Sequence, residues 1–413
     1  MMLTTGFLLG TEALGRAQRA DDVAALLREP AVRAAVERAR SVEPQTLEDQ
    51  VRFCEVPAPP FGEAARGELL RKAFVALRLQ NVRVDKAGNV IGDRPGERPR
   101  PHLVVAAHLD TVFPAETRVN VTRQGAILKG PGIGDNCRGL AVLVATVRAL
   151  NEAQLRTRGT VTFVANVGEE GLGDLRGVKA LFGETMRGQI DRFVTIDNAG
   201  LQLSTVGVGS RRYRFTFRGR GGHSFADFGR ASPANALGRA IARIAEFRVT
   251  SNPRTTFNVG RIGGGTSVNA IPEDAWMEVD IRSSDAASLR ELDARLQKAV
   301  DDAVVEENAR WGRGAAVTVV KTLVGDRPAG SVSPTAPIVR TAEAVARALG
   351  LATSPSEASS DANLPMSLGI PAIAIGGGGH SSGSHSDAEQ FDSTNAWQGT
   401  QYAVVLTVAL ARD

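Results

Sequence analysis

The residues of this chain best suited to metal or acid–base chemistry are histidines and carboxylates that follow predicted strands. His108 and Asp110 come directly after the apolar run 103–107, which is typical of a strand buried inside a parallel sheet. Because side chains alternate along an extended chain, the two can point the same way. A metal-ligating imidazole commonly donates its other N–H to a carboxylate, and a His-x-Asp pair supplies one. The alternative is a structural histidine beside a carboxylate.

A second candidate, Asp135, lies in the glycine-rich stretch GPGIGDNCRG at 130–139, directly before an apolar helix predicted over 139–150. Asp135 can be interpreted as the N-cap of that helix, since Asp is a preferred capping residue. The glycines can also be interpreted as a phosphate loop, but the Lys-Ser/Thr pair of such loops is missing.

Adjacent carboxylates, Glu169 and Glu170, follow the apolar strand predicted over 161–165. Two neighbouring negative charges at a strand end are unfavourable unless cations offset them. Asp197 ends the next apolar strand, 193–196, in the same way. These carboxylates therefore add acidic groups at two further strand ends.

The last candidate, His385, follows the apolar strand predicted over 372–375, with His380 as its rival. The carboxyl ends of parallel strands meet at one edge of an open sheet, so the candidate residues are expected to converge there. Histidines and carboxylates without thiolates suit Zn²⁺, Mn²⁺ or Co²⁺. A pair of metals also needs a bridging carboxylate and a further carboxylate as base. The residues alone favour a dinuclear metal hydrolase.

The order of predicted elements explains how these residues are positioned. Strands alternate with helices up to about residue 205, which indicates a three-layer α/β domain with a mixed, mostly parallel sheet. The order then becomes strand, helix, strand, strand, helix, strand, which is typical of a small α+β sandwich. We therefore predict one domain, 1–205 with 325–413, interrupted by another at 206–324. Helices are expected at 12–41 (two), 63–78, 139–150, 232–246, 286–307, 338–349 and 394–411.

Composition excludes several classes of protein. The 413 residues are 43% hydrophobic and 23% charged, an ordinary globular balance. The net charge is +4 and no dense basic run occurs, so nucleic-acid binding is not indicated. Apolar stretches are too short for a membrane span, and the first residues lack the features of a signal peptide. Two cysteines, Cys54 and Cys137, fit a reducing compartment, so a cytoplasmic protein is expected.

These motifs, taken in order, resemble the M20 family of metallopeptidases and deacylases. The resemblance covers nearly the whole chain, at family-like spacing, and implies an inserted α+β, ferredoxin-like lid or dimerisation domain. The matching stretches are HLDT at 108–111, GIGDNCRG at 132–139, GEEGLG at 168–173, ID at 196–197, RGGHSF at 220–225, TSVNAIPEDA at 266–275, VDIRS at 279–283, SDAN at 360–363 and SHSDAE at 384–389.

The resemblance implies roles for these residues around two divalent ions, with zinc expected first and manganese or cobalt as alternatives. The implied metal ligands are His108, Asp135, Glu170, Asp197 and His385. Asp135 would bridge the ions, and its peptide bond to Asn136 would be cis. Asp197 would bind the same ion as His108. Asp110 would orient the imidazole of His108. Glu169 would be the general base.

In the inserted domain, the resemblance implies that His223 reaches into the site of a partner subunit and stabilises the oxyanion. A homodimer would follow. Without the resemblance, His223 is interpreted as a strand-end residue that caps a turn. Asn269 and Arg282 match residues that hold the carboxylate of the substrate, a contact for which arginine is suited. Arg282 alone can equally be a solvated strand residue.

The expected activity is hydrolysis of amide bonds in short peptides by an exopeptidase of the di- or tripeptidase type. The alternative is a deacylase or amidohydrolase of N-acyl amino acids. A non-catalytic binding protein on the same scaffold is a third hypothesis. The presence of Glu169 beside a full set of ligands argues against it.

Overall fold

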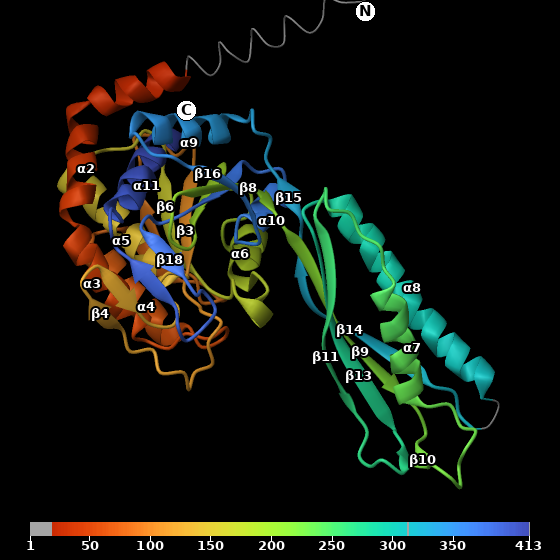
Figure 1. Ribbon diagram of the computed structural model, residues 1–413. Coiled ribbons are helices and arrows are strands. Elements are labelled where there is room, and N and C mark those ends of the chain that lie inside the picture. Colours follow the sequence, from red (N-terminus) through yellow and green to blue (C-terminus); the bar gives the residue numbers. More distant parts are fainter. Residues whose placement is uncertain (1–18, 312–313, 413) are drawn as a thin grey trace, which may run out of the picture. The chain divides into compact units, whose positions relative to one another are not determined.

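The computed structural model describes residues 19–311 and 314–412, which form two compact units (Figure 1). The chain leaves the first unit between Gly207 and Val208 and returns to it between Gly330 and Ser331. The boundary expected after residue 324 lies inside strand β14, Thr318–Arg327, so the second unit ends after a complete strand.

A mixed, mostly parallel sheet lies at the centre of the first unit, as predicted. Among the described residues it has nine strands, in the order β1-β2-β6-β3-β7-β17-β8-β15, with β16 paired to β8. The strands are β1 Gln80–Val84, β2 Val90–Arg94, β3 Leu103–His108, β6 Val161–Asn166, β7 Arg192–Ile196, β8 Gln202–Gly207, β15 Gly330–Ser331, β16 Ser354–Ala358 and β17 Ala372–Ile375. Because β6, β3, β7 and β17 are parallel, their carboxyl ends share one edge.

Helices cover both faces of this sheet and complete the three predicted layers (Figure 1). All six residues of β3 are buried, and alternate residues enter different cores. Val105 packs in the core that contains α2, α4, α5, α9 and α11, whereas Val104 packs in the core that contains α6 and α10. The helices are α2 Pro30–Ser41, α3 Glu43–Cys54, α4 Ala64–Ala76, α5 Cys137–Glu152, α6 Arg176–Ala180, α9 Pro337–Ala348, α10 Asn363–Ser367 and α11 Trp397–Leu410.

The helix pair predicted over 12–41 is observed as residues 19–28 and α2, and residues 12–18 of that prediction lie outside the described residues. Helix α3 was not predicted. In the described part of the chain, no helix is both long enough and apolar enough to span a membrane.

A small second sheet in the first unit joins two loops that are far apart in the sequence. Its strands, in the order β18-β19-β5-β4, are β18 His380–Ser382, β19 Gln390–Asp392, β5 Ile127–Lys129 and β4 Thr122–Gln124. Strands β19 and β5 are antiparallel, with Phe391 opposite Leu128. The segment after His385 therefore lies beside the segment that leads into the Asp135 loop.

The second unit has the predicted α+β order. Within 208–311 and 314–330, its main sheet has four antiparallel strands in the order β11-β13-β9-β14. Phe215 and Phe217 of β9 pack with residues of α7 and α8, so both helices cover the same face (Figure 1). The bounds are β9 Gly209–Arg218, α7 Pro233–Ala245, β11 Thr255–Gly264, β13 Asp274–Ser283 and α8 Ala286–Arg310, with a short ladder of β10 Gly222–His223 and β12 Ala270–Ile271.

Candidate metal centre

The first group of possible ligands surrounds His108, the last residue of β3. Its buried imidazole directs Nε2 towards two carboxylates, 3.3 Å from Oδ1 of Asp135 and 3.7 Å from Oδ1 of Asp197. The other ring nitrogen, Nδ1, lies 3.0 Å from the carbonyl oxygen of Asp110 and 3.6 Å from its Oδ1. The imidazole is therefore held from one side by Asp110 and faces possible ligands on the other.

The second group surrounds His385. Nε2 of His385 lies 3.1 Å from Oε1 of Glu170 and 3.3 Å from Oδ2 of Asp135. The two oxygens of Asp135 thus face different histidines, one in each group. Both sets, His108 with Asp135 and Asp197, and Asp135 with Glu170 and His385, have the donor atoms close enough to surround one ion each. This is the geometry expected of a bridging carboxylate.

The loop that carries Asp135 is attached to the neighbouring strand end by Asn136. The peptide between Asp135 and Asn136 is cis, as the resemblance implied. Oδ1 of Asn136 accepts hydrogen bonds from the N–H groups of Gly139 (3.0 Å) and Asn198 (3.1 Å). Its amide donates to the carbonyl of Ile196 at 2.9 Å. Asn136 is therefore the N-cap of α5, and the alternative interpretation of Asp135 as that cap is wrong.

Asp110 positions the loop of Glu169 and Glu170. One oxygen of Asp110 accepts the N–H of Glu169 at 3.0 Å, and the other accepts the N–H of Glu170 at 2.7 Å. Both glutamates are buried, and they form a third possible ligand group with His108. Asp110 therefore contacts a residue of each group of possible ligands, His108 in the first and Glu170 in the second.

The charges in the site shift the pKa values of its groups. Burial lowers the pKa of His108, but its hydrogen bond to Asp110 and the carboxylates of Asp135 and Asp197 raise that pKa well above its usual value. Asp135 and then Glu170 raise the pKa of His385 to about 10. Burial raises the pKa of Asp135, but the two histidines lower it by more than burial raises it. The net result is a pKa well below the usual range.

Divalent cations fit this set of residues. Oδ1 of Asp135 is buried and accepts no hydrogen bond from any described residue. It faces Nε2 of His108 at 3.3 Å, and a cation held between these two atoms would take both as ligands. The nitrogen and oxygen donors match the preferences of zinc, manganese and cobalt.

We predict that metal affinity rises with pH. Because Asp135 and Glu170 raise the pKa of His385 to about 10, this imidazole must lose a proton before it ligates an ion, and the raised pKa of His108 acts in the same direction. Calorimetric zinc titrations in buffers of different ionisation enthalpy should detect proton release on binding at pH 7. Binding without proton release, and with an affinity that does not change with pH, would contradict this prediction.

The residues predicted in the inserted domain belong to the second unit, and their roles stay predictions. His223 is exposed in β10, and its Nδ1 accepts the N–H groups of Phe225 (3.2 Å) and Ala226 (3.3 Å). It caps a turn, as the alternative interpretation stated. Asn269 is exposed. Arg282 lies on the face of β13 opposite its buried residues, where its Nε donates to Asp280 at 2.7 Å.

Two buried carboxyl groups near the site were not assigned a role from the sequence. Asp361 accepts a hydrogen bond from the amide of Asn166 at 2.7 Å, and burial raises its pKa to about 7. Glu389 accepts hydrogen bonds from backbone N–H groups of the Asp135 loop. Its place four residues after His385 was the available signal in the sequence.

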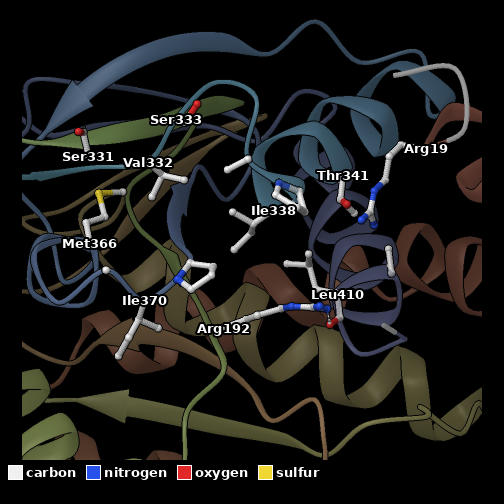
Figure 2. A pocket seen from close by; sticks show the side chains of 15 residues that line it. Arg19, Arg192, Ser331, Val332, Ser333, Ile338, Thr341, Met366, Ile370 and Leu410 are labelled. Carbon is white, nitrogen blue, oxygen red and sulfur yellow. Dashed lines mark hydrogen bonds between the residues drawn. The ribbon is translucent and has the colours of Figure 1, made fainter. Parts of the chain in front are cut away.

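A cavity of about 340 Å³ lies elsewhere in the first unit (Figure 2). Arg192, at the start of β7, and Leu410, at the end of α11, line it, and the arginine donates to the carbonyl of Leu410. The predicted ligands instead follow the carboxyl ends of the strands. No residue predicted to bind metal or substrate is among the described residues that line this cavity.

Comparison with known proteins gives consistent results. Residues 104–408 match the model of peptidase family M20/M25/M40. Carboxypeptidase G2 of Pseudomonas sp. strain RS-16 is 28% identical over 340 residues, which are 76% of each chain. N-acetylcysteine deacetylase of Bacillus subtilis strain 168 is 24% identical over 276 residues, 63% of this chain and 68% of that one. The crystal structure of a tripeptidase from Staphylococcus aureus superimposes with a TM-score of 0.74 at 22% identity, covering 90% of this chain and 99% of that one.

The family match extends over most of the chain and includes His108, Asp135, Glu170, Asp197 and His385. The similar structure adds support for the fold. The chain therefore belongs to peptidase family M20/M25/M40 and is a metal-dependent amide hydrolase.

Proposed function

We propose that this protein is an exopeptidase that cleaves short peptides with two divalent ions, of which zinc is the first candidate. The observation that carries the proposal is the position of Asp135, whose two oxygens face His108 and His385 separately. The buried Glu169 lies beside both groups and is not needed to complete either of them. A bridging carboxylate with a further carboxylate nearby is the arrangement that hydrolysis at two metals requires.

In this proposal the two ion positions share Asp135. His108 and Asp197 would complete one position, and Glu170 and His385 the other. When bound, the ions would supply Lewis acidity that lowers the pKa of water and polarises the amide carbonyl. Asp110 contacts both the imidazole of His108 and the backbone of the glutamate loop, so it would fix the distance between the two ion positions.

Glu169 would move the proton. As general base it would take a proton from the attacking water, and as general acid it would deliver that proton to the leaving amine. His223 from a partner subunit would donate to the oxygen on which negative charge develops. Its Nδ1 accepts backbone N–H groups, so the other ring nitrogen, Nε2, carries the proton that it would donate.

The proposed homodimer predicts complementation between two inactive variants. Glu169→Gln and His223→Ala should each be inactive alone. A mixed dimer would hold one site with an intact Glu169 and an intact His223 from its partner. After subunit exchange at equal amounts, about a quarter of wild-type activity should return, since half of the dimers are mixed and half of their sites are complete. If His223 acts within its own chain, the mixture stays inactive.

The proposed role of Arg282 predicts a selective loss. Arg282→Ala should lower kcat/KM about ten- to a hundredfold for a free-acid peptide, the equivalent of about 1.5–3 kcal/mol for a hydrogen bond to a charged group. The loss should shrink sharply for the same peptide with an amidated carboxyl group. Arg261→Ala is a matched control, because Arg261 is also ion-paired on this sheet, to Glu278 at 2.9 Å. Equal losses on both peptides would show that Arg282 does not bind the carboxylate.

A second candidate activity is the deacylation of N-acyl amino acids. The similarity to N-acetylcysteine deacetylase favours it, because that relative is named for such a reaction. A panel of tripeptides and N-acetyl amino acids, assayed with added Zn²⁺, Mn²⁺ or Co²⁺, separates the two. Faster turnover of tripeptides supports the exopeptidase, and turnover of acyl amino acids alone would replace it.

We also propose that the protein acts in the cytoplasm. Its cysteines, Cys54 and Cys137, are both free and buried, as expected in a reducing compartment. Cell fractionation with a tagged chain tests this proposal, and recovery of the protein outside the cytoplasm would contradict it.

A further inference from the structure

Glu389 lies where two loops of the metal centre meet. It follows His385 by four residues and precedes β19, which pairs with β5. Strand β5 in turn leads into the loop of Asp135. The carbonyl of Glu389 accepts the N–H of Gly130 at 3.1 Å, which extends the contact between the two segments into this loop.

The side chain of Glu389 is fully buried, and its carboxylate receives three backbone N–H groups from the Asp135 loop. Oε1 accepts those of Gly134 (2.8 Å) and Asp135 (3.0 Å), and Oε2 accepts that of Gly132 (2.8 Å). Backbone N–H groups that converge in this way form a concave binding site for an anion. Here the carboxyl group of Glu389 occupies that place, so the loop is shaped around Glu389.

The glycine at position 134 makes this close approach possible. A Cβ atom on Gly134 would lie 3.1 Å from Oε1 of Glu389 and 2.3 Å from Oγ of Ser381. The hydroxyl of Ser381 would have to move, and Oε1 of Glu389 would have to give way slightly. A larger residue at 134 would therefore press on both Ser381 and the Glu389 carboxylate.

Asp135 and His385 come from these two loops, yet both face the same ion position. The side chain of His385 is 54% exposed, so burial does little to hold it. Glu389 connects the two segments through its carboxylate and its carbonyl. We propose that Glu389 is a positioning residue that sets the distance between Asp135 and His385, and thereby the metal affinity of the position they form with Glu170. This inference rests on the proposed metal-binding function.

The test is a stepwise zinc titration of the full-length protein, monitored by competition with a chromophoric chelator. The wild type should bind two ions. Glu389→Gln keeps the shape of the side chain but turns an NH₂ group towards at least one N–H donor of the loop. The variant should lower the affinity for one zinc ion about 10- to 100-fold, the usual effect of losing a partner of a metal ligand. The affinity for the other ion should stay within about threefold of the wild-type value. His385→Ala, which removes a ligand of that position alone, identifies the affected ion.

A purely structural role would give a different result. If Glu389 acts through the metal position, excess zinc should restore the kcat of Glu389→Gln and leave KM for the peptide unchanged. Glu307→Gln is the matched control, because Glu307 in the second unit is also fully buried and accepts a backbone N–H, that of Ser232, at 3.0 Å. It should lower the melting temperature without changing either zinc affinity.

Gly134→Ala disturbs the same contact by changing the loop instead of Glu389. It provides a second test if Glu389→Gln fails to fold. It should weaken the same ion, whereas Gly183→Ala, where a Cβ would meet nothing within 4 Å, should not. If the wild type binds no zinc, the proposed function itself has failed. The positioning role is overturned if the wild type binds two ions and Glu389→Gln binds both with unchanged affinity. It is also overturned if the variant lowers both affinities equally.

Discussion

Replacement of Glu169 by glutamine is expected to lower kcat about 10²–10⁴-fold, the range for loss of a general acid–base group, while both metal ions stay bound. Glutamine fills the same buried space but cannot take a proton from water. The backbone N–H of residue 169 would still donate to Asp110, so the loop that holds Glu170 should keep its shape. Peptide turnover and metal content, measured on one preparation, check this result.

Glu184→Gln is a suitable control for this variant, because Glu184 is an exposed carboxylate in a later segment of the same unit. It should leave kcat unchanged. Two outcomes would contradict the role of Glu169: a variant with wild-type kcat, or a variant that loses its metals together with its activity, which would make Glu169 a ligand.

Replacement of Asp135 by asparagine should have a larger effect on metal binding than any other single change in the site. The substitution removes one charge and turns an NH₂ group towards either His108 or His385. Affinity for both ions should fall by more than about 100-fold, beyond the range for partners that only support a ligand. Activity should fall to that of the chelated wild type and should not return with moderate excess metal.

Zinc titration of Asp135→Asn measures this effect, with Asp302→Asn as the control. Asp302 is a surface carboxylate paired with Lys298 in the second unit, so its loss should leave both affinities unchanged. If Asp135→Asn loses only one ion, Asp135 is a ligand of one position and not a bridge.

Much of the centre could be predicted because its ligands follow strands that are clear in the sequence. The run before His108 is continuously apolar, and the run before Asp197 is apolar except for Thr195; such strands are buried and parallel. Parallel strands place their carboxyl ends together, so the convergence of these residues followed from the fold class. The second unit was predictable for a related reason, because Phe215 and Phe217 alternate with polar residues along one strand.

The parts that were missed depend on contacts between distant segments. Asn136 and Asp135 are both good capping residues, and the hydrogen bond from the Gly139 N–H to Asn136 decides between them, while further bonds attach Asn136 to the strand end at 196–198. Strands β5 and β19 have three residues each, too few to show a period. The role of Glu389 depends on their pairing and therefore had no local signal beyond its distance from His385.

The central claim is that Asp135 bridges two ions. The most direct measurement is a crystal structure of the zinc-loaded protein with anomalous scattering data collected at the zinc edge. We predict two zinc ions about 3.5–4 Å apart. One oxygen of Asp135 should contact the ion of His108 and Asp197, and the other should contact the ion of Glu170 and His385. A zinc-loaded structure in which Asp135 contacts neither ion would contradict the account.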